Sequence, residues 1–220
     1  MHHARLYSVL AIFLIGAGLN DVFGQCSSPS TSGPLAIVCA WPDINCSFGA
    51  AWQQHKRGVV YYRYYDDECD AIKIGTGFLV TTTDLDGRQF IVTSAHTIST
   101  SAEASSMDVF FGYENDGCTG SFAGTPFCTS GATLLASDTL YDFTLLELDG
   151  PIPTAEEPFF TGWDVSGVPP DEAFAIHHPK GHPKKISIEA DPLTTVTFDF
   201  PDTNSCYYFD MAPSAHWSVN

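Results

Sequence analysis

Short β-type runs separated by turn residues are the feature that most restricts how this chain can fold. The clearest runs cover residues 59–65, 90–94 and 143–148, which are rich in Val, Ile, Phe, Tyr and Thr. Further runs of the same kind lie at 77–81, 107–113, 133–136, 173–176 and 194–198. No segment keeps the helical period of about 3.6 residues. The pattern therefore predicts an all-β protein, either a barrel or a sandwich.

The composition excludes several classes of protein. Apolar residues make up 44% of the 220 residues and aromatic residues 13%, so the chain can build a core and is not disordered. Acidic residues outnumber basic ones 26 to 9, which gives a net charge of −17. Because phosphate contacts require clustered Lys and Arg, we expect no nucleic-acid partner. The acidic surface is typical of a soluble, self-repelling monomer.

The amino terminus has the pattern of a secretory signal peptide. Arg5 precedes an apolar run over 9–19, and small Gly24 can stand before the cleavage point. The run is too short to cross a bilayer, which takes about 20 residues. We therefore expect residues 1–24 to be removed and the protein to be secreted, without membrane contact. A buried amino-terminal helix is the alternative.

The cysteines predict a disulfide framework, which agrees with secretion. There are seven of them: Cys26, Cys39, Cys46, Cys69, Cys118, Cys128 and Cys206. An odd number means either one unpaired thiol or a partner elsewhere. Zinc is the rival explanation, but no C-x-x-C motif occurs. Adjacent His177 and His178 would point to opposite faces of a strand and could not bind one ion together. We expect no metal and no cofactor.

His96 and Asp142 are the candidate catalytic residues. His96 follows a β-run that ends in small residues, and Asp142 stands at the start of a strongly apolar β-run. Taken singly, each has an ordinary structural interpretation, a capped His and a turn Asp. They lie 46 residues apart, in the order His then Asp. The Ser-His-Asp triad of proteases built from β-barrels has the same order, with about 45 residues between the two. Order, spacing, secretion and β-structure together favour a catalytic pair.

Several motifs make the chain resemble a known family. Residues 93–96, Thr-Ser-Ala-His, resemble the Thr-Ala-Ala-His of trypsin-like serine proteases. Residues 142–148, Asp-Phe-Thr-Leu-Leu-Glu-Leu, are similar to the bacterial lysyl-endopeptidase branch. The same branch also matches, in the same order along the chain, the segment 39–46, Gly162-Trp163 and the Ile-His-His-Pro of 176–179. The resemblance covers residues 39–220.

The resemblance implies a two-barrel, chymotrypsin-like fold. Residues 25–158 would form the amino-terminal β-barrel that carries both candidate catalytic residues. Residues 159–220 would form an incomplete carboxyl-terminal β-barrel. The Pro-rich segment 151–158 is the best candidate linker between them.

The resemblance also implies roles for single residues. His96 would be the general base and acid, and Asp142 the carboxylate that orients it. Trp163 and His216 match an aromatic ring and an imidazole near the triad carboxylate, although a core Trp and a strand His are the simpler interpretations. We expect His177 and His178 to be structural.

The cysteine pattern of the family is only partly present. Cys46 and Cys118 match a disulfide pair of the resembling branch. Cys39 matches a cysteine whose partner lies in the second barrel, past residue 220. Thr97 stands where the family usually has Cys, so Cys69 would lose its usual partner. No pairing is implied for Cys69, Cys128 and Cys206.

The nucleophile is missing from the pattern. No Ser after Asp142 has glycines on both sides. In the triad of the proteases built from β-barrels, the Ser follows the Asp by about 93 residues, which projects to roughly position 235. We therefore expect an amino-terminal fragment of a secreted serine endopeptidase that acts on proteins or peptides and is inactive alone. The branch suggests Lys at the cleaved position. The alternative is a catalytically inactive, protease-like secreted domain that binds a partner.

Overall fold

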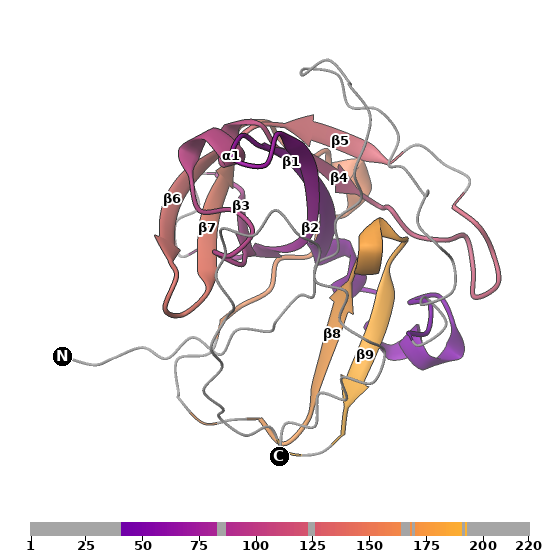
Figure 1. Ribbon diagram of the computed structural model, residues 1–220. Helices are drawn as coiled ribbons and strands as arrows, with labels where there is room; N and C mark the ends of the chain where they lie inside the picture. The colour runs from indigo at the N-terminus through magenta and orange to yellow at the C-terminus, as the bar shows by residue number, and fades with distance from the viewer. Residues whose placement is uncertain are drawn as a thin grey trace.

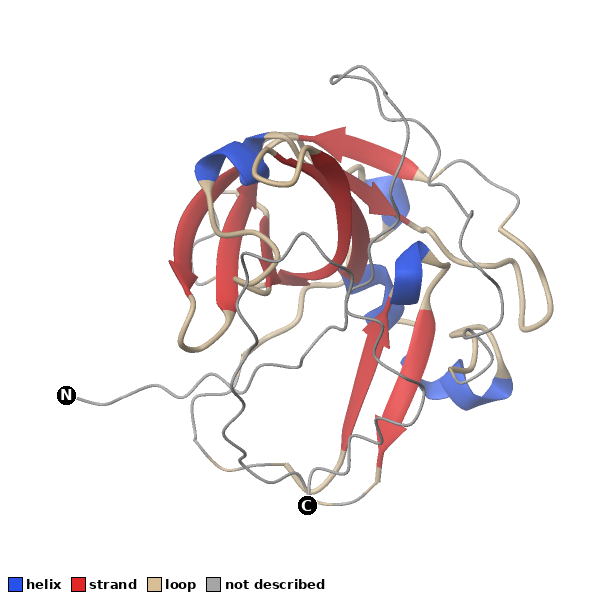
Figure 2. Cartoon of the chain, viewed as in Figure 1, coloured by secondary structure: helices blue, strands red, loops and turns tan. Residues whose placement is uncertain are grey.

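One seven-stranded antiparallel sheet dominates the computed structural model (Figure 1), which describes residues 41–82, 87–122, 126–163, 168, 170–190 and 192. The strand order is β5-β4-β1-β2-β3-β7-β6. The bounds are β1 Val59–Asp66, β2 Ala71–Val80, β3 Phe90–Thr93, β4 Asp108–Phe111, β5 Phe127–Ser130, β6 Ala132–Asp138 and β7 Phe143–Leu148. Figure 2 shows that the helices are short and that some of them lie where the barrel meets the second sheet. They are α1 Ser101–Ser105 and the 3₁₀ helices η2 Ser47–Trp52, η3 His55–Gly58, η4 Thr154–Glu156 and η5 Pro179–Gly181.

The sheet closes on itself at Gly131. Its two outer strands, β5 and β6, are consecutive in the chain and only this glycine separates them. Strand β5 pairs with β4 and strand β6 pairs with β7, so both edges of the sheet belong to one bent stretch of chain. Gly131 has a φ of +82°, which favours glycine at this corner. The result is a barrel, and the predicted all-β class is confirmed.

Strand β1 is buried on both faces, which explains its continuous aromatic and β-branched sequence. Val60, Tyr62 and Tyr64 point into the barrel core. Val59 and Tyr61 lie in two other apolar clusters, one of them shared with the second sheet.

The second sheet is a hairpin of β8 Ala173–His177 and β9 Lys185–Glu189 that packs beside the barrel (Figure 1). The amide of Lys184 donates to the Tyr113 carbonyl at 3.2 Å, which joins the hairpin to the loop after β4. Residues before β1 flank the hairpin as well, because Asp43 forms a bridge with Lys185 and the amide of Ile186 donates to Pro42. The two-barrel division at residue 158 remains a prediction.

Some sequence expectations differ from the structure or lie outside it. Strands β5 and β9 and helix α1 were not expected, and the run expected at 107–113 is a strand only over Asp108–Phe111. The run 194–198, the signal peptide, His216, Cys26, Cys39 and Cys206 lie outside the described residues. Within the described part of the chain, no helix has the length and apolar character needed to cross a membrane.

Candidate active site

A tight turn at the end of β3 presents His96. The amides of Thr97 and Ile98 both donate to the Ser94 carbonyl at 3.2 Å, which folds the chain back directly after the strand. The hydroxyls of Ser94 and Thr97 lie 2.6 Å apart and are both buried. The His96 side chain is 25% exposed, so one edge of the imidazole reaches solvent.

Asp142 occupies the last position before β7. Its backbone has a φ of +51°, a left-handed conformation that Asp tolerates better than most residues. Strands β3 and β7 are paired with Thr93 opposite Thr144, so the chain after β3 and the chain before β7 meet at the same end of the barrel. Asp142 is only 7% exposed. The strand register therefore holds a buried carboxylate under the His96 turn.

The carboxylate of Asp142 contacts His96 at two points. Oδ2 lies 2.7 Å from His96 Nδ1, and Oδ1 accepts the His96 backbone amide at 2.8 Å. Because a carboxylate only accepts hydrogen bonds, Nδ1 carries the proton and Nε2 is the acceptor nitrogen of the neutral ring. The same side chain thus fixes the position, the orientation and the tautomer of His96. This arrangement suits a general base.

Hydroxyl groups surround the turn where the resembling proteases usually have a cysteine. Thr97 fills that position and bonds to Ser94. The Thr93 hydroxyl donates to the Thr76 carbonyl at 3.0 Å. Thr93 has no second proton, so Tyr62 must donate across the 2.7 Å contact between the two hydroxyls. Burial raises the pKa of Tyr62, so this donor stays protonated.

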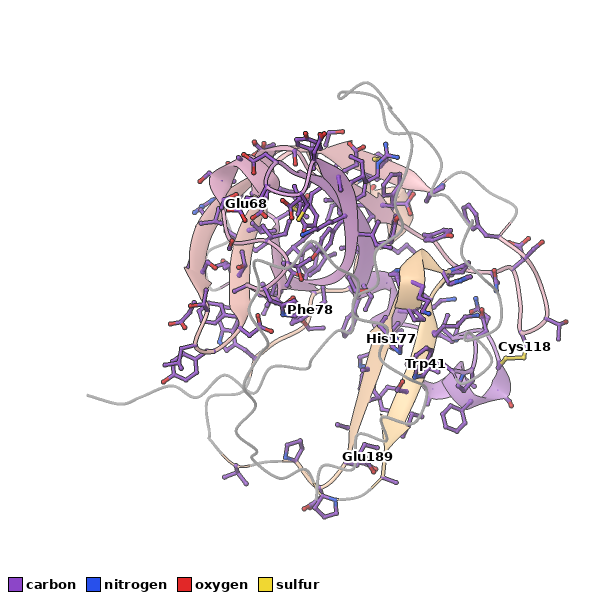
Figure 3. All side chains as sticks on the ribbon, in the orientation of Figure 1. Trp41, Glu68, Phe78, Cys118, His177 and Glu189 are labelled. Atoms are coloured by element: carbon purple, nitrogen blue, oxygen red, sulfur yellow. A yellow bond between two sulfur atoms is a disulfide. The ribbon has the colours of Figure 1, made fainter. Side chains whose placement is uncertain are left out.

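The structure gives a mixed picture of the other residues singled out from the sequence. Trp163 is 59% exposed, and its partner His216 is not described, so their place near the triad remains a prediction. Cys46 and Cys118 form a disulfide that ties the segment before η2 to the loop after β4 (Figure 3). Cys69 and Cys128, for which the resemblance implied no pairing, are disulfide-bonded too.

The adjacent histidines His177 and His178 are both buried, but their side chains have different neighbours. His177 meets Trp41 edge-on at 5.6 Å (Figure 3) and shares a 3.1 Å hydrogen bond with Ser187. His178 stacks on Tyr113. Burial lowers the pKa of His177 to about 4 and that of His178 well below its usual value. No group of metal-ligating side chains occurs among the described residues.

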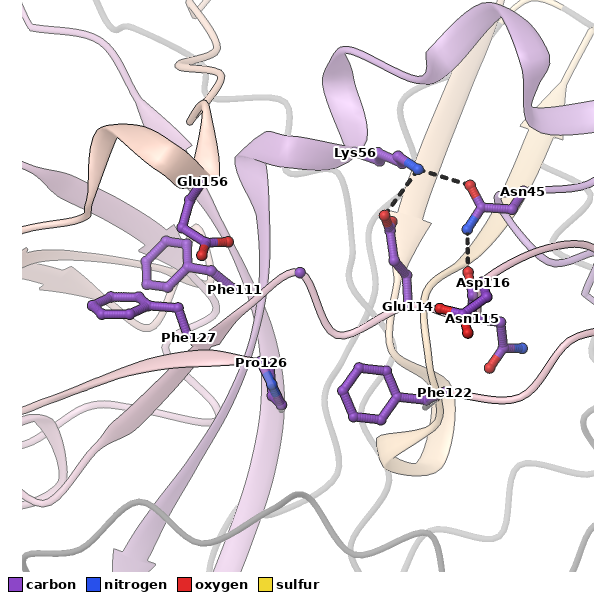
Figure 4. A pocket seen from close by; sticks show the side chains of 11 residues that line it. Asn45, Lys56, Phe111, Glu114, Asn115, Asp116, Phe122, Pro126, Phe127 and Glu156 are labelled. Carbon is purple, nitrogen blue, oxygen red and sulfur yellow. Dashed lines mark hydrogen bonds and ion pairs between the residues drawn. The ribbon is translucent and has the colours of Figure 1, made fainter. Parts of the chain in front are cut away.

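A second polar cluster borders a pocket of about 360 Å³, which neither His96 nor Asp142 lines (Figure 4). Lys56 Nζ lies 2.9 Å from Glu114 and 2.7 Å from Asn45. Burial lowers the pKa of Lys184, which lies 4.0 Å from Glu114, to about 8. The cluster joins η3, the loop after β4 and the hairpin.

Sequence reasoning missed the hydroxyl groups that support His96 and Asp142. Tyr62 and Thr144 lie on β-strands, where aromatic and β-branched residues are common for reasons of packing alone. Nothing in the sequence distinguished them from other strand residues. The motif around His96 did contain Ser94 and Thr97, and that spacing was the only available signal.

Comparison with known proteins identifies the family. The model of the family described as lysyl endopeptidase, C-terminal domain, matches residues 38–219. A lysyl endopeptidase of Pseudomonas aeruginosa is 30% identical over 197 residues, which is 87% of this chain. The chain spans 40% of the length of that relative.

Solved structures of a protease from M. tuberculosis, Rv3671c, also match. The active form aligns with a TM-score of 0.39 and 17% identity, over 78% of this chain and 60% of that one. An inactive mutant form gives 0.40 and 18%, over 75% and 60%. The assignment depends on the sequence family and not on these structural scores. The chain belongs to the lysyl endopeptidase C-terminal domain family of proteases.

Proposed function

We propose that this chain supplies the histidine and the aspartate of a secreted, trypsin-like serine endopeptidase. The observation that carries the proposal is the two-point contact between Asp142 and His96, at 2.7 Å to Nδ1 and 2.8 Å to the backbone amide. Asp142 is buried, whereas His96 reaches solvent at one edge. A buried carboxylate behind a partly exposed imidazole is the arrangement that a general base requires.

In the proposed reaction, His96 Nε2 takes the proton of a serine hydroxyl as its oxygen attacks the peptide carbonyl carbon. The tetrahedral intermediate then collapses and the C–N bond breaks. His96 gives the same proton to the leaving amine, and an acyl-enzyme remains. Water repeats the sequence and frees the acid. Asp142 stays ionised throughout and stabilises the imidazolium through Nδ1–H.

The serine belongs, in this proposal, to sequence outside the 220 residues. None of the serines after Asp142 is flanked by glycines, as a tight nucleophile turn would require. The match to only 40% of the P. aeruginosa relative agrees with this. The name of that relative, lysyl endopeptidase, makes cleavage after Lys the first specificity to test. Secretion is proposed on the apolar run over 9–19 and the disulfides.

The test uses the product of the whole gene locus, assayed on peptides with Lys, Arg, Leu or Glu at the cleaved bond. We expect Asp142→Asn to lower kcat by about 10⁴-fold and His96→Ala by at least as much. Exposed Asp67→Asn is the matched control for loss of one acidic charge and should leave kcat unchanged. Equal rates for His96→Ala and the parent would contradict the proposal.

A catalytically inactive binding domain is the second candidate, and the lack of a Gly-flanked serine in these residues favours it. A fluorophosphonate that acylates activated serines separates the two. Labelling that depends on His96 supports the protease. A folded locus product that neither hydrolyses peptides nor takes up the label leaves the binding domain as the better proposal.

A further inference from the structure

We propose that Thr144 is a positioning residue that holds the His96–Asp142 pair in register; the inference rests on the function proposed above. Thr144 lies two residues after Asp142 and is completely buried. Its hydroxyl donates to the Ile98 carbonyl at 2.6 Å, and Ile98 lies two residues after His96. The turn that carries His96 is therefore held at His96 by Asp142 and at Ile98 by Thr144.

The two attachments are parallel links between the same segments. Asp142 accepts a hydrogen bond from the amide of His96, and Thr144 donates one to the carbonyl of Ile98; each pair is separated by 46 residues in sequence. One link uses an acceptor, the Asp142 carboxylate just before β7, and the other a donor, the Thr144 hydroxyl on β7. Two links of opposite polarity at different points of a turn prevent it from rotating about either one.

Strand β6 supports the second link. Ser137 Oγ lies 2.8 Å from the Thr144 hydroxyl, and these residues are paired in the β6–β7 register. The single hydroxyl proton of Thr144 is used on Ile98, so Ser137 must be the donor in this contact. The resulting chain runs from Ser137 through Thr144 to Ile98, and each bond polarises the next. It joins three segments of the barrel behind the catalytic pair.

The turn is stiff enough to transmit a disturbance at Ile98 to His96. Its backbone bonds end on the Ser94 carbonyl, and the hydroxyls of Ser94 and Thr97 are bonded to each other. A shift of Ile98 therefore moves the turn as a unit about the Asp142 contact. That motion lengthens or bends the Nδ1–Oδ2 bond and changes where Nε2 points.

The test compares Thr144→Val, which removes the hydroxyl at nearly constant volume, with Thr144→Ser, which keeps it. Thr161→Val is the matched control, because the Thr161 hydroxyl also donates to a strand carbonyl, that of Leu79, at 2.7 Å. The first readout is proton exchange at His96 Nδ1, followed by NMR on this chain without any nucleophile. The second is kcat and KM of the locus product.

We expect Thr144→Val to speed Nδ1 proton exchange about ten-fold and to lower kcat about ten-fold, with KM changed less than about two-fold. Thr144→Ser should restore both readouts to within about three-fold of the parent. Thr161→Val should lower stability and leave both readouts unchanged. If Thr144→Val behaves like Thr161→Val, Thr144 is only structural and the proposal fails.

Two further outcomes are decisive. If Thr144→Val does not fold, Ser137→Ala replaces it, because Ser137 is exposed and its loss removes only the outer donor. About three-fold faster exchange supports the proposal and no change overturns it. If exchange responds to Thr144 but the parent hydrolyses no peptide, positioning is supported and the proposed protease function fails.

Discussion

Protonation of His177 should make the docking of the hairpin on the barrel sensitive to acid. The imidazole is 4% exposed, and it lies between Trp41 and Ser187. Its Nδ1 is buried without a hydrogen-bond partner among the described residues. Lys185 lies opposite His177 in the register of β8 and β9. A proton on this ring would be poorly solvated, which is why burial lowers the pKa of His177 to about 4.

The sign and size of the effect follow from the two pKa values. In the unfolded chain the imidazole of His177 titrates near 6.5, and in the folded chain near 4. Between pH 6.5 and 4 the His177 imidazole binds a proton in the unfolded chain but stays neutral in the folded chain. The stability from this group is complete above pH 6.5 and is lost as the pH falls towards 4. The loss amounts to about 3 kcal/mol at pH 4. His178 and His182, whose pKa values are also lowered, act in the same direction.

Urea unfolding followed by tryptophan fluorescence at several pH values between 7 and 4 measures the effect. His177→Gln keeps a partner for Ser187 and removes the titrating group, so the parent should lose about 3 kcal/mol more than this variant across the range. Ser187→Ala is the control, because it removes the hydrogen bond and should cost the same at every pH. Parallel curves for the parent and His177→Gln would refute the reasoning.

Two further predictions concern the framework. Replacing both Cys46 and Cys118 by Ser opens a link across 72 residues, and the loop-closure entropy predicts a loss of about 4 kcal/mol in non-reducing urea unfolding; a loss below about 1 kcal/mol contradicts it. Gly131→Ala and Gly87→Ala both place a side chain at positive φ, but a Cβ at 131 would lie 2.6 Å from Asp149 Oδ2 whereas 87 is open. Thermal unfolding should show a cost of about 1 kcal/mol for Gly87→Ala and about 2 kcal/mol for Gly131→Ala, because the Asp149 carboxylate must move and loses its 3.0 Å hydrogen bond from Thr133; equal losses would show that the carboxylate moves aside without cost.

The fold class was predictable because the strands carry their own signal. Strand β1 is aromatic and β-branched on both faces, and β7 has the same apolar character. Strand β5 was missed because Phe127–Ser130 is only 4 residues long, and two of the four, Cys128 and Ser130, carry no strand signal. It is a strand because β4 supplies partners for its backbone and Gly131 turns the chain into β6. Tertiary pairing, which a local pattern cannot show, decides such a segment.

The candidate pair was predictable as residues but not as geometry. Order and spacing singled out His96 and Asp142. The contact of one carboxylate with both the amide and the ring of His96 depends on the β3–β7 register and on the left-handed backbone of Asp142. The hydrogen bond from the Thr144 hydroxyl to Ile98 could not be predicted from the sequence, because Thr is common in strands for its shape alone.

Thr in place of Cys at position 97 changes how the turn that carries His96 is held. A disulfide in such a place would fix the turn by one covalent bond. Here Thr97 and its neighbours use hydrogen bonds instead, to Ser94 within the turn and from Thr144 to Ile98 outside it. Each such bond contributes about 1 kcal/mol net, but a buried group that loses its partner costs more than that. The position of His96 therefore depends on several hydroxyls together, and substitutions at these small residues should affect catalysis more than their size suggests.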